Sequence, residues 1–231
     1  PESHQGRVWC VAVPRKGNVV ATGSNAGTVR LWNLDTGKTR WIQFGKSAVA
    51  GVSALAFSTR DNFLAAAGYQ TTEFDSTGYL RIHDVTTGET AFERDFAGRV
   101  TAVAYSPDGA TLAVADGEML RGMPIPPSAK SPVISLWDIA SREQKSKLAG
   151  HQGPVGRFTF TPNGKALISV DRSTAICSWD AATGALLSST PIDGHAAREV
   201  LGAAFTPDGS AAVTSGLFGE RIIITDLATG K

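Results

Sequence analysis

The 231-residue chain has an ordinary globular composition, with 42% hydrophobic and 19% charged residues. Its 22 Lys and Arg nearly balance its 21 Asp and Glu, so charge gives no reason to expect nucleic acid or an acidic membrane surface as a partner. No apolar run approaches the roughly 18 residues of a membrane helix, and we expect no membrane insertion. The 25 glycines and 11 prolines, without a collagen period, indicate many short strands joined by turns.

Two motifs recur along the whole chain. One begins with Trp, His or Thr and in most copies has Asp at its second position and Thr-Gly at its fifth and sixth; it occupies residues 32–38, 83–89, 137–143, 179–185 and 225–231. The other is an apolar residue followed by a turn of the Ser-Pro-Asp-Gly type. Its copies begin at 13, 57, 105, 160 and 205, at steps of 44, 48, 55 and 45 residues. The recurring Asp at the strand end predicts a turn-capping role.

Each repeat predicts four antiparallel strands. A strand with spaced apolar residues, such as Val8, Val11 and Val13, leads into the first turn, and a small-residue strand such as 64–68 follows. A third strand ends in the motif that contains Thr-Gly, and a more polar fourth strand comes after it. Four strands within a period in the mid-forties are typical of a propeller blade. A helical alternative is weak, because no apolar stripe at helical spacing continues past the next Gly or Pro.

The sequence therefore predicts an all-β fold, a β-propeller built from four-stranded antiparallel blades. About five blades are expected, at approximately residues 1–45, 46–97, 98–149, 150–193 and 194–231, in a single propeller segment over 1–231. The fifth is expected to be incomplete, because the chain stops where its fourth strand should begin. Since an unpaired blade edge exposes backbone donors and acceptors, we interpret the chain as a fragment of a longer propeller.

The motifs resemble those of the WD-repeat family of β-propellers over essentially the whole chain, with turns of a bacterial style. The fourth repeat matches most closely, opening with Gly150-His151 and ending its third strand with Trp179-Asp180. In the family, a His, a strand Ser or Thr, a loop Asp and the Trp form a hydrogen-bonded tetrad inside a blade. The resemblance implies this structural role for four residues of the fourth repeat: His151, Ser169, Asp171 and Trp179.

The other repeats carry only parts of this set. The first repeat has His4, Thr22 and Trp32 but no evident Asp, and the second has His83 in the place of the Trp. The histidines therefore indicate structural hydrogen bonds more than catalysis or metal binding. No GxSxG, HExxH or phosphate loop occurs, and Cys10 and Cys177 lack the spacing of metal ligands. We expect a non-enzyme with no cofactor and no metal.

Two alternatives to a binding scaffold stay open. Trp41 follows Gly37 by four residues, which resembles the tryptophan-docking motif of quinoprotein propellers and implies a propeller dehydrogenase. The corresponding places in the next three repeats hold Phe92, Ser146 and Ser188. The other alternative is a purely structural spacer next to an unseen catalytic domain.

Two insertions, at 69–78 and 117–131, separate the second and third strands of adjacent repeats. Hairpin loops usually have about 2–5 residues, and apolar side chains on a proline-stiffened loop are typical of a contact surface. They could instead cover their own blade as a local lid. We expect a non-catalytic scaffold for a protein or peptide, with the cytoplasm slightly favoured and the oligomeric state open. The expected contact residues are Tyr69, Phe74, Met119, Leu120, Arg121, Met123 and Ile125.

Overall fold

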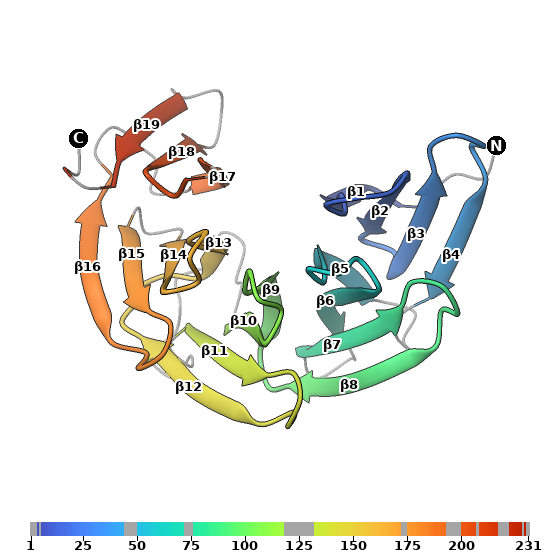
Figure 1. Ribbon diagram of the computed structural model, residues 1–231, viewed down its shortest axis with the longest axis horizontal. Helices are drawn as coiled ribbons and strands as arrows, with labels where there is room; N and C mark the ends of the chain where they lie inside the picture. Colours follow the sequence, from blue (N-terminus) through green and yellow to red (C-terminus); the bar gives the residue numbers. More distant parts are fainter. Residues whose placement is uncertain are drawn as a thin grey trace. The chain divides into compact units, whose positions relative to one another are not determined.

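A computed structural model describes residues 4, 6–43, 50–71, 76–117, 132–171, 175–192, 200–206, 208–216, 222–227 and 229. Every regular element in these ranges is a β-strand. The strands form five antiparallel sheets in sequence order, β1–β4, β5–β8, β9–β12, β13–β16 and β17–β19 (Figure 1). The prediction of an all-β propeller with four-stranded blades is confirmed. The chain separates into two compact units, residues 1–105 and 106–231, which are described in turn.

The first unit contains two complete sheets and strand β9. Each strand pairs with the preceding one in its sheet. The first sheet consists of β1 (Val8–Ala12), β2 (Val19–Ser24), β3 (Thr28–Asn33) and β4 (Thr39–Gln43). The second consists of β5 (Ala50–Phe57), β6 (Phe63–Thr71), β7 (Ser76–Asp84) and β8 (Thr90–Phe96), after which β9 covers Arg99–Tyr105.

Apolar side chains hold the two sheets of this unit together. Strand β5 packs against β1 and β2, and Val29, Val52 and Leu64, all fully buried, belong to one core cluster. Gly23 allows this approach, because a Cβ there would lie 2.6 Å from both the Val52 side chain and Cys10 Sγ. Burying one such aliphatic side chain contributes roughly 1.5–3 kcal/mol.

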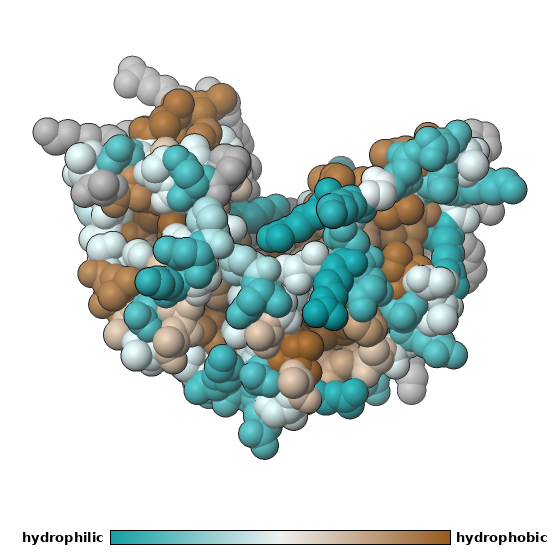
Figure 2. Space-filling model, viewed as in Figure 1, coloured by the Kyte–Doolittle hydropathy of each residue, from teal (hydrophilic) through white to brown (hydrophobic). Residues whose placement is uncertain are grey.

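The spaced apolar residues of each first strand form a surface for packing between sheets. In the second sheet Val52 and Leu55 are 0% and 9% exposed. The corresponding Val8 and Val11 of the first sheet are 52% and 63% exposed, and hydrophobic surface is visible over this sheet in Figure 2. The repeated apolar pattern thus encodes contact with a neighbouring sheet.

The second unit contains the remaining strands. They are β10 (Thr111–Gly117), β11 (Val133–Asp138) and β12 (Gln144–Ala149), then β13 (Val155–Phe160), β14 (Ala166–Asp171), β15 (Ala175–Asp180) and β16 (Leu186–Pro191). The last sheet has three strands among the described residues, β17 (Val200–Phe205), β18 (Ala211–Gly216) and β19 (Ile222–Asp226). Ile168 and Ile176 share a core cluster with Val200 and Ala212, which joins the last two sheets.

The turns confirm the capping role predicted for the recurring Asp. Asp84 Oδ1 accepts hydrogen bonds from the backbone N–H groups of Thr86 and Thr87, and Asp138, Asp180 and Asp226 accept equivalent bonds in their repeats. Hydrogen bonds from the Thr87 backbone above all, together with those from Thr86, lower the pKa of Asp84. Each of these turns is therefore held by local bonds that its own seven residues provide.

Candidate functional site

In the first unit, Trp9 and Arg99 from two different strands lie beside the ring of Tyr69 on a third strand. The ring centroids of Trp9 on β1 and Tyr69 on β6 are 6.0 Å apart, with an interplanar angle of 32°. The guanidinium carbon of Arg99 on β9 lies 4.1 Å from the centroid of the Tyr69 ring, within the range of a cation–π interaction. All three residues are half-buried. We call Trp9, Tyr69 and Arg99 the stacked cluster.

Glycines fix the position of Tyr69. Its cross-strand partners are Gly51 on β5 and Gly78 on β7. A Cβ at Gly51 would lie 2.7 Å from two ring carbons of Tyr69 and 2.8 Å from its hydroxyl, so the ring covers the backbone of Gly51. A glycine without a side chain is what permits this close approach.

A β-bulge in β1 sets the direction of the Trp9 side chain. In the pairing of β1 with β2, Val8 is opposite Ser24 and Cys10 is opposite Gly23, so Trp9 has no partner of its own in the register. A bulge bends the strand locally and changes the direction of the side chain. The direction of Trp9 therefore depends on this irregularity and not on simple strand alternation.

A buried phenol supports the cluster from within the second sheet. Tyr79 is 1% exposed, and its hydroxyl donates to the Gly51 carbonyl at 3.2 Å. Burial raises the pKa of Tyr79 above its ordinary value, so the phenol remains a neutral donor. Arg81 lies over the Tyr79 ring and forms ion pairs with Glu93 and Asp95 at 3.0 and 3.1 Å.

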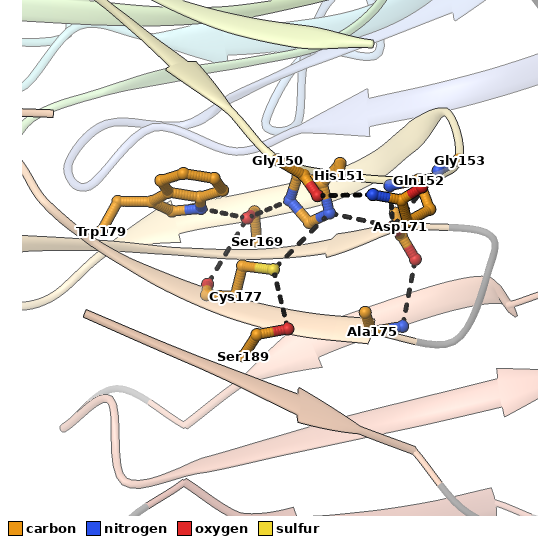
Figure 3. Close-up of polar contacts among 10 residues, drawn as sticks. All are labelled: Gly150, His151, Gln152, Gly153, Ser169, Asp171, Ala175, Cys177, Trp179 and Ser189. Atoms are coloured by element: carbon orange, nitrogen blue, oxygen red, sulfur yellow. Dashed lines mark hydrogen bonds and ion pairs between the residues drawn. The ribbon is translucent and has the colours of Figure 1, made fainter. Parts of the chain in front are cut away.

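The fourth repeat brings its four predicted tetrad residues together (Figure 3). The indole N–H of Trp179 donates to Ser169 Oγ at 2.8 Å, and Ser169 Oγ lies 2.7 Å from His151 Nε2. His151 Nδ1 lies 3.0 Å from Asp171 Oδ2. The side chains of His151 and Asp171 are fully buried.

The positions of the hydrogens in this network follow from which atoms can donate a hydrogen bond and which can only accept one. The Asp171 carboxylate can only accept, so His151 Nδ1 carries a hydrogen. Asp171 also accepts backbone hydrogen bonds from Ala175 at 3.0 Å and more distantly from Gln152 and Gly153, which stabilise its charge. Burial by itself lowers the pKa of His151, but the hydrogen bonds to Asp171 and Cys177 and the coulombic effects of these two residues together outweigh it and raise that pKa to about 9.

The first repeat builds a similar network without a carboxylate. His4 Nε2 lies 2.7 Å from Thr22 Oγ1, which also accepts the indole N–H of Trp32 at 2.8 Å. His4 Nδ1 lies 3.0 Å from Thr28 Oγ1, which in turn lies 2.9 Å from Ser24 Oγ. Burial, with a smaller effect from Arg30, lowers the pKa of His4. Hydroxyl groups thus take the place of the missing Asp, and burial favours a neutral imidazole.

Among the described residues of the second repeat, no strand hydroxyl takes the place of Ser169. His83 pairs with Leu64 as Trp179 pairs with Leu167 in the fourth repeat, and Ala66 stands where Ser169 would be. Burial lowers the pKa of His83. Its Nδ1 lies 3.3 Å from Thr90 Oγ1. Small buried residues of β6 and the Tyr79 phenol fill this region of the second sheet.

Comparison with known proteins identifies the repeat. Residues 2–33 and 142–180 match the family model described as "WD domain, G-beta repeat". These two segments are therefore similar to WD repeats. The two matching segments include the two networks just described, and the resemblance inferred from the sequence is confirmed at this level. In both, a His and a Trp converge on one strand hydroxyl.

Several curated WD-repeat relatives match most of the chain. U3 small nucleolar RNA-associated protein 21 homolog of Schizosaccharomyces pombe is 26% identical over 82% of this chain and 19% of that protein. Target of rapamycin complex subunit wat1 of the same yeast is 28% identical over 66% of this chain and 42% of that protein. WD repeat-containing protein SL1-17 of Schistosoma mansoni is 29% identical over 80% and 54%, respectively. The chain spans about a fifth to a half of these relatives.

Of the seven expected contact residues, Tyr69 lies in the part of the chain that the structure describes. The other six, Phe74, Met119, Leu120, Arg121, Met123 and Ile125, lie outside the described residues. Sequence reasoning missed Trp9 and Arg99, the neighbours of Tyr69. The sequence signal for Trp9 was an aromatic residue within an otherwise aliphatic first strand.

Three further findings concern metal binding, membrane spanning and disulfides. Among the described residues, no group of three or more His, Cys, Asp or Glu side chains is placed to hold a metal ion. In the same ranges, no helix is long and apolar enough to span a bilayer. The thiols of Cys10 and Cys177 are not joined in a disulfide.

Proposed function

We propose that this WD-repeat chain is a non-catalytic scaffold that binds a protein or peptide. The observation that carries the proposal is the stacked cluster. Trp, Tyr and Arg are the residue types that most often dominate binding energy at protein interfaces. Here they come from β1, β6 and β9 and hold one another in place. Because the sheets fix these side chains before a partner arrives, less conformational entropy is lost on binding.

The relatives support a protein partner. One is named as a subunit of the target of rapamycin complex, which places that protein in an assembly. The nearly balanced charge of the present chain supports a protein more than a nucleic acid. Expected contact residues such as Met119 and Leu120 would extend the same binding function into the long loops.

A structural role for the tetrad supports the non-catalytic part of the proposal. Ser169, His151 and Asp171 are linked in the order of a hydrolase triad. However, Ser169 is 0% exposed, and its oxygen already accepts the indole N–H of Trp179. A substrate carbonyl cannot approach a nucleophile in this environment, so these bonds serve to hold the blade.

The proposal is tested by quantitative affinity purification from the source organism. Trp9→Ala with Tyr69→Ala should lose the specifically bound proteins, because the aromatic contact area disappears. The control is Leu187→Ala, which removes an exposed apolar side chain (59%) from β16 of the second unit. A separate variant with Met119, Leu120 and Met123 replaced by Ser tests the long loop. Thermal unfolding of every variant is measured alongside.

The outcomes separate the possibilities. A binding scaffold is supported if the cluster variant or the loop variant loses the specifically bound proteins while Leu187→Ala retains them. Thermal unfolding of these variants should then be unchanged. Lost folding of the loop variant would favour the lid interpretation for 117–131. If wild type and all variants retain the same background proteins, the scaffold proposal is wrong.

A further inference from the structure

We infer that a pocket in the second unit binds a guanidinium group, carried by an arginine side chain of a partner protein. The pocket has a volume of about 300 Å³, at the lower end of the range for ligand sites. Side chains of the fourth and fifth sheets line it, among them Ser178, Ser188, Thr190, Ser210, Asp226 and Leu227. We call it the Ser188 pocket. It involves none of the stacked-cluster residues, so the inference adds a site that the proposed function does not require.

In the first unit, an arginine of the chain itself binds the corresponding turn. Arg40 is on β4, and its guanidinium donates to the backbone carbonyls of Val85, Thr86 and Thr87 in the turn after β7. Asp84 keeps its own bonds to the amides of this turn. Its pKa is lowered chiefly by the Thr87 amide, and the charge of Arg40 adds to this effect. A turn of this type therefore accepts a guanidinium on its carbonyl oxygens while its Asp remains the cap.

Ser188 stands in the place of Arg40 in the fourth sheet. Arg40 on β4 is opposite the residue that precedes Trp32, and Ser188 on β16 is opposite the residue that precedes Trp179. A serine has neither the length nor the charge of an arginine. The position that reaches the next turn in the first unit is therefore occupied by a short side chain in the second.

The turns that these two positions face also correspond. The N–H of Val85 donates to the Asn62 carbonyl at 2.9 Å, and the N–H of Leu227 donates to the Ser210 carbonyl at 2.8 Å. Leu227 and Ser210 both line the Ser188 pocket. The pocket is therefore next to the same kind of turn that Arg40 binds.

A second serine explains why a cavity forms here. Ser178 is the cross-strand partner of Ser188, and it stands where the first three sheets have the buried residues Leu31, Ile82 and Leu136. Each of these apolar side chains fills space that a serine leaves open. The pair of serines thus removes volume from both strands that border the turn.

The third sheet shows that a serine on the fourth strand does not open a pocket by itself. Ser146 on β12 is opposite the buried Leu136. A Cβ added to Gly184 in the next turn would lie 3.2 Å from Ser146 Cβ and 3.3 Å from a methyl carbon of Leu148. Turn and strand therefore pack directly against each other in that place. The cavity depends on Ser178 as well as on Ser188.

The walls of the pocket suit an arginine side chain better than a bare cation. Ile168 and Ile176 line it, and the methylene stem of an arginine packs well on apolar surface. The hydroxyl groups of Ser188 and Thr190 and the carboxylate of Asp226 are on the same walls. A guanidinium presents five N–H donors in one plane, whereas a lysine ammonium concentrates its three donors on one nitrogen. Acceptors spread around the pocket therefore favour the guanidinium.

NMR titration of the whole chain with N-acetyl-arginine N-methylamide tests the inference. The backbone amide signals of Thr190, Ser210 and Leu227 should shift as the probe binds. The matching lysine compound should bind roughly 10-fold more weakly, because it makes fewer charge-assisted hydrogen bonds. Methylguanidinium should also bind more weakly than the arginine compound, because it lacks the stem that packs on the apolar wall.

Two arginine substitutions on β16 form a matched pair. Ser188→Arg should fill the pocket with a guanidinium of the chain itself and abolish binding of the arginine compound. Leu187→Arg adds the same charge at the neighbouring, exposed position, and it should retain binding. Urea unfolding of both variants checks that they are folded, and Ser188→Arg should be at least as stable as wild type.

Arg40→Ser gives the reciprocal test in the first unit. The substitution should lower the melting temperature, because the bonds to the turn carbonyls are lost. Millimolar methylguanidinium should restore part of this loss, and methylammonium should not. Wild type should gain less from methylguanidinium, since its own Arg40 already binds the turn.

Each result supports or overturns the inference. Equal binding of the arginine and lysine compounds, or retained binding by folded Ser188→Arg, would overturn it. Loss of binding in Leu187→Arg as well would show that the effect is long-range charge repulsion, not occupancy of the pocket. Equal gain of Arg40→Ser and wild type from methylguanidinium would show that Arg40 is no guide to the pocket. None of these outcomes affects the stacked cluster, so the scaffold proposal is decided by its own experiment.

Discussion

His151 donates its Nδ1 hydrogen to Asp171 across 3.0 Å inside the fourth repeat. In the first repeat the equivalent nitrogen of His4 meets the hydroxyl of Thr28 at the same distance. The carboxylate raises the pKa of His151, and its absence leaves burial free to lower the pKa of His4. Two repeats with the same arrangement of His, hydroxyl and Trp therefore shift the pKa of their histidine in opposite directions.

The first prediction concerns the pH dependence of stability. The folded-state pKa of His151 is about 9, above the unfolded value near 6.5, so its contribution is complete below about pH 6.5 and is lost as pH rises through about 9. The pKa of Asp171 is lowered, so its contribution is present above its unfolded value near 4 and is lost as pH falls through the folded value. The pair therefore stabilises most between about pH 4 and 6.5.

Urea unfolding of wild type and Asp171→Asn measures this contribution. The difference in unfolding free energy should fall by about 1–3 kcal/mol between about pH 6 and pH 9.5. Titration of His4 occurs in both proteins and largely cancels in the difference. A difference that stays constant over this range would show that Asp171 does not hold His151 protonated.

The second prediction transfers the carboxylate to the first repeat. Ser24 is opposite Val8 in the register, as Asp171 is opposite Val155. Ser24→Asp should therefore place a carboxylate near His4 and raise the pKa of that imidazole from below its ordinary value to above it. NMR titration of the His4 ring protons measures the change. An unchanged or lower pKa would show that equivalent register does not create an equivalent network.

The third prediction concerns two turns with left-handed backbone. Arg142 has a φ of 62° at the place where other repeats have Gly37, Gly88 or Gly184. A side chain is disfavoured in this region, so Arg142→Gly should stabilise the protein by about 1 kcal/mol. Gly37→Arg is the reciprocal variant, because φ there is also 62° and nothing lies within 4 Å of an added Cβ. It should destabilise by a similar amount in the same unfolding assay.

The sequence predicted the sheets well because the information is local. Asp, Thr and Gly within seven residues define each turn, as Asp84 shows with its bonds to the two following threonine amides. The tetrad could also be predicted, because His151 and Trp179 have family-specific positions at either end of the repeat. Where the glycine of a turn of the Ser-Pro-Asp-Gly type is replaced, by contrast, the compensating bonds come from another repeat. Asp61 has a φ of 60°, and its carboxylate accepts backbone hydrogen bonds from Arg15 and Lys16 of the first repeat.

The stacked cluster could not be predicted in the same way. The orientation of Trp9 depends on a bulge that interrupts the register between Val8 and Cys10, and residue types alone do not locate a bulge. Arg99 reaches Tyr69 only because strands from successive repeats pack together. The replacement of Asp by Ser24 and Thr28 was missed for a related reason, since hydroxyls at these positions form the network only after β2 and β3 are aligned.

The fourth prediction tests whether the backbone of Gly51 positions Tyr69. A Cβ at this residue would lie 2.7 Å from the Tyr69 ring, closer than nonbonded atoms can approach, so Gly51→Ala should displace the ring or the strand. We expect a loss of about 1–3 kcal/mol in unfolding free energy and weaker binding of any ligand that contacts the ring. Gly17→Ala is not a suitable control, because its φ of 97° adds backbone strain.

Gly156→Ala is the better control, since the nearest atom to an added Cβ is a carbonyl oxygen at 3.9 Å. This variant should leave stability nearly unchanged. Combining Gly51→Ala with Tyr69→Ala should recover much of the lost stability, because removal of the ring removes the clash. If the double variant is instead less stable than wild type by the full sum of the two single effects, the two residues act independently, and the ring is positioned by contacts other than Gly51.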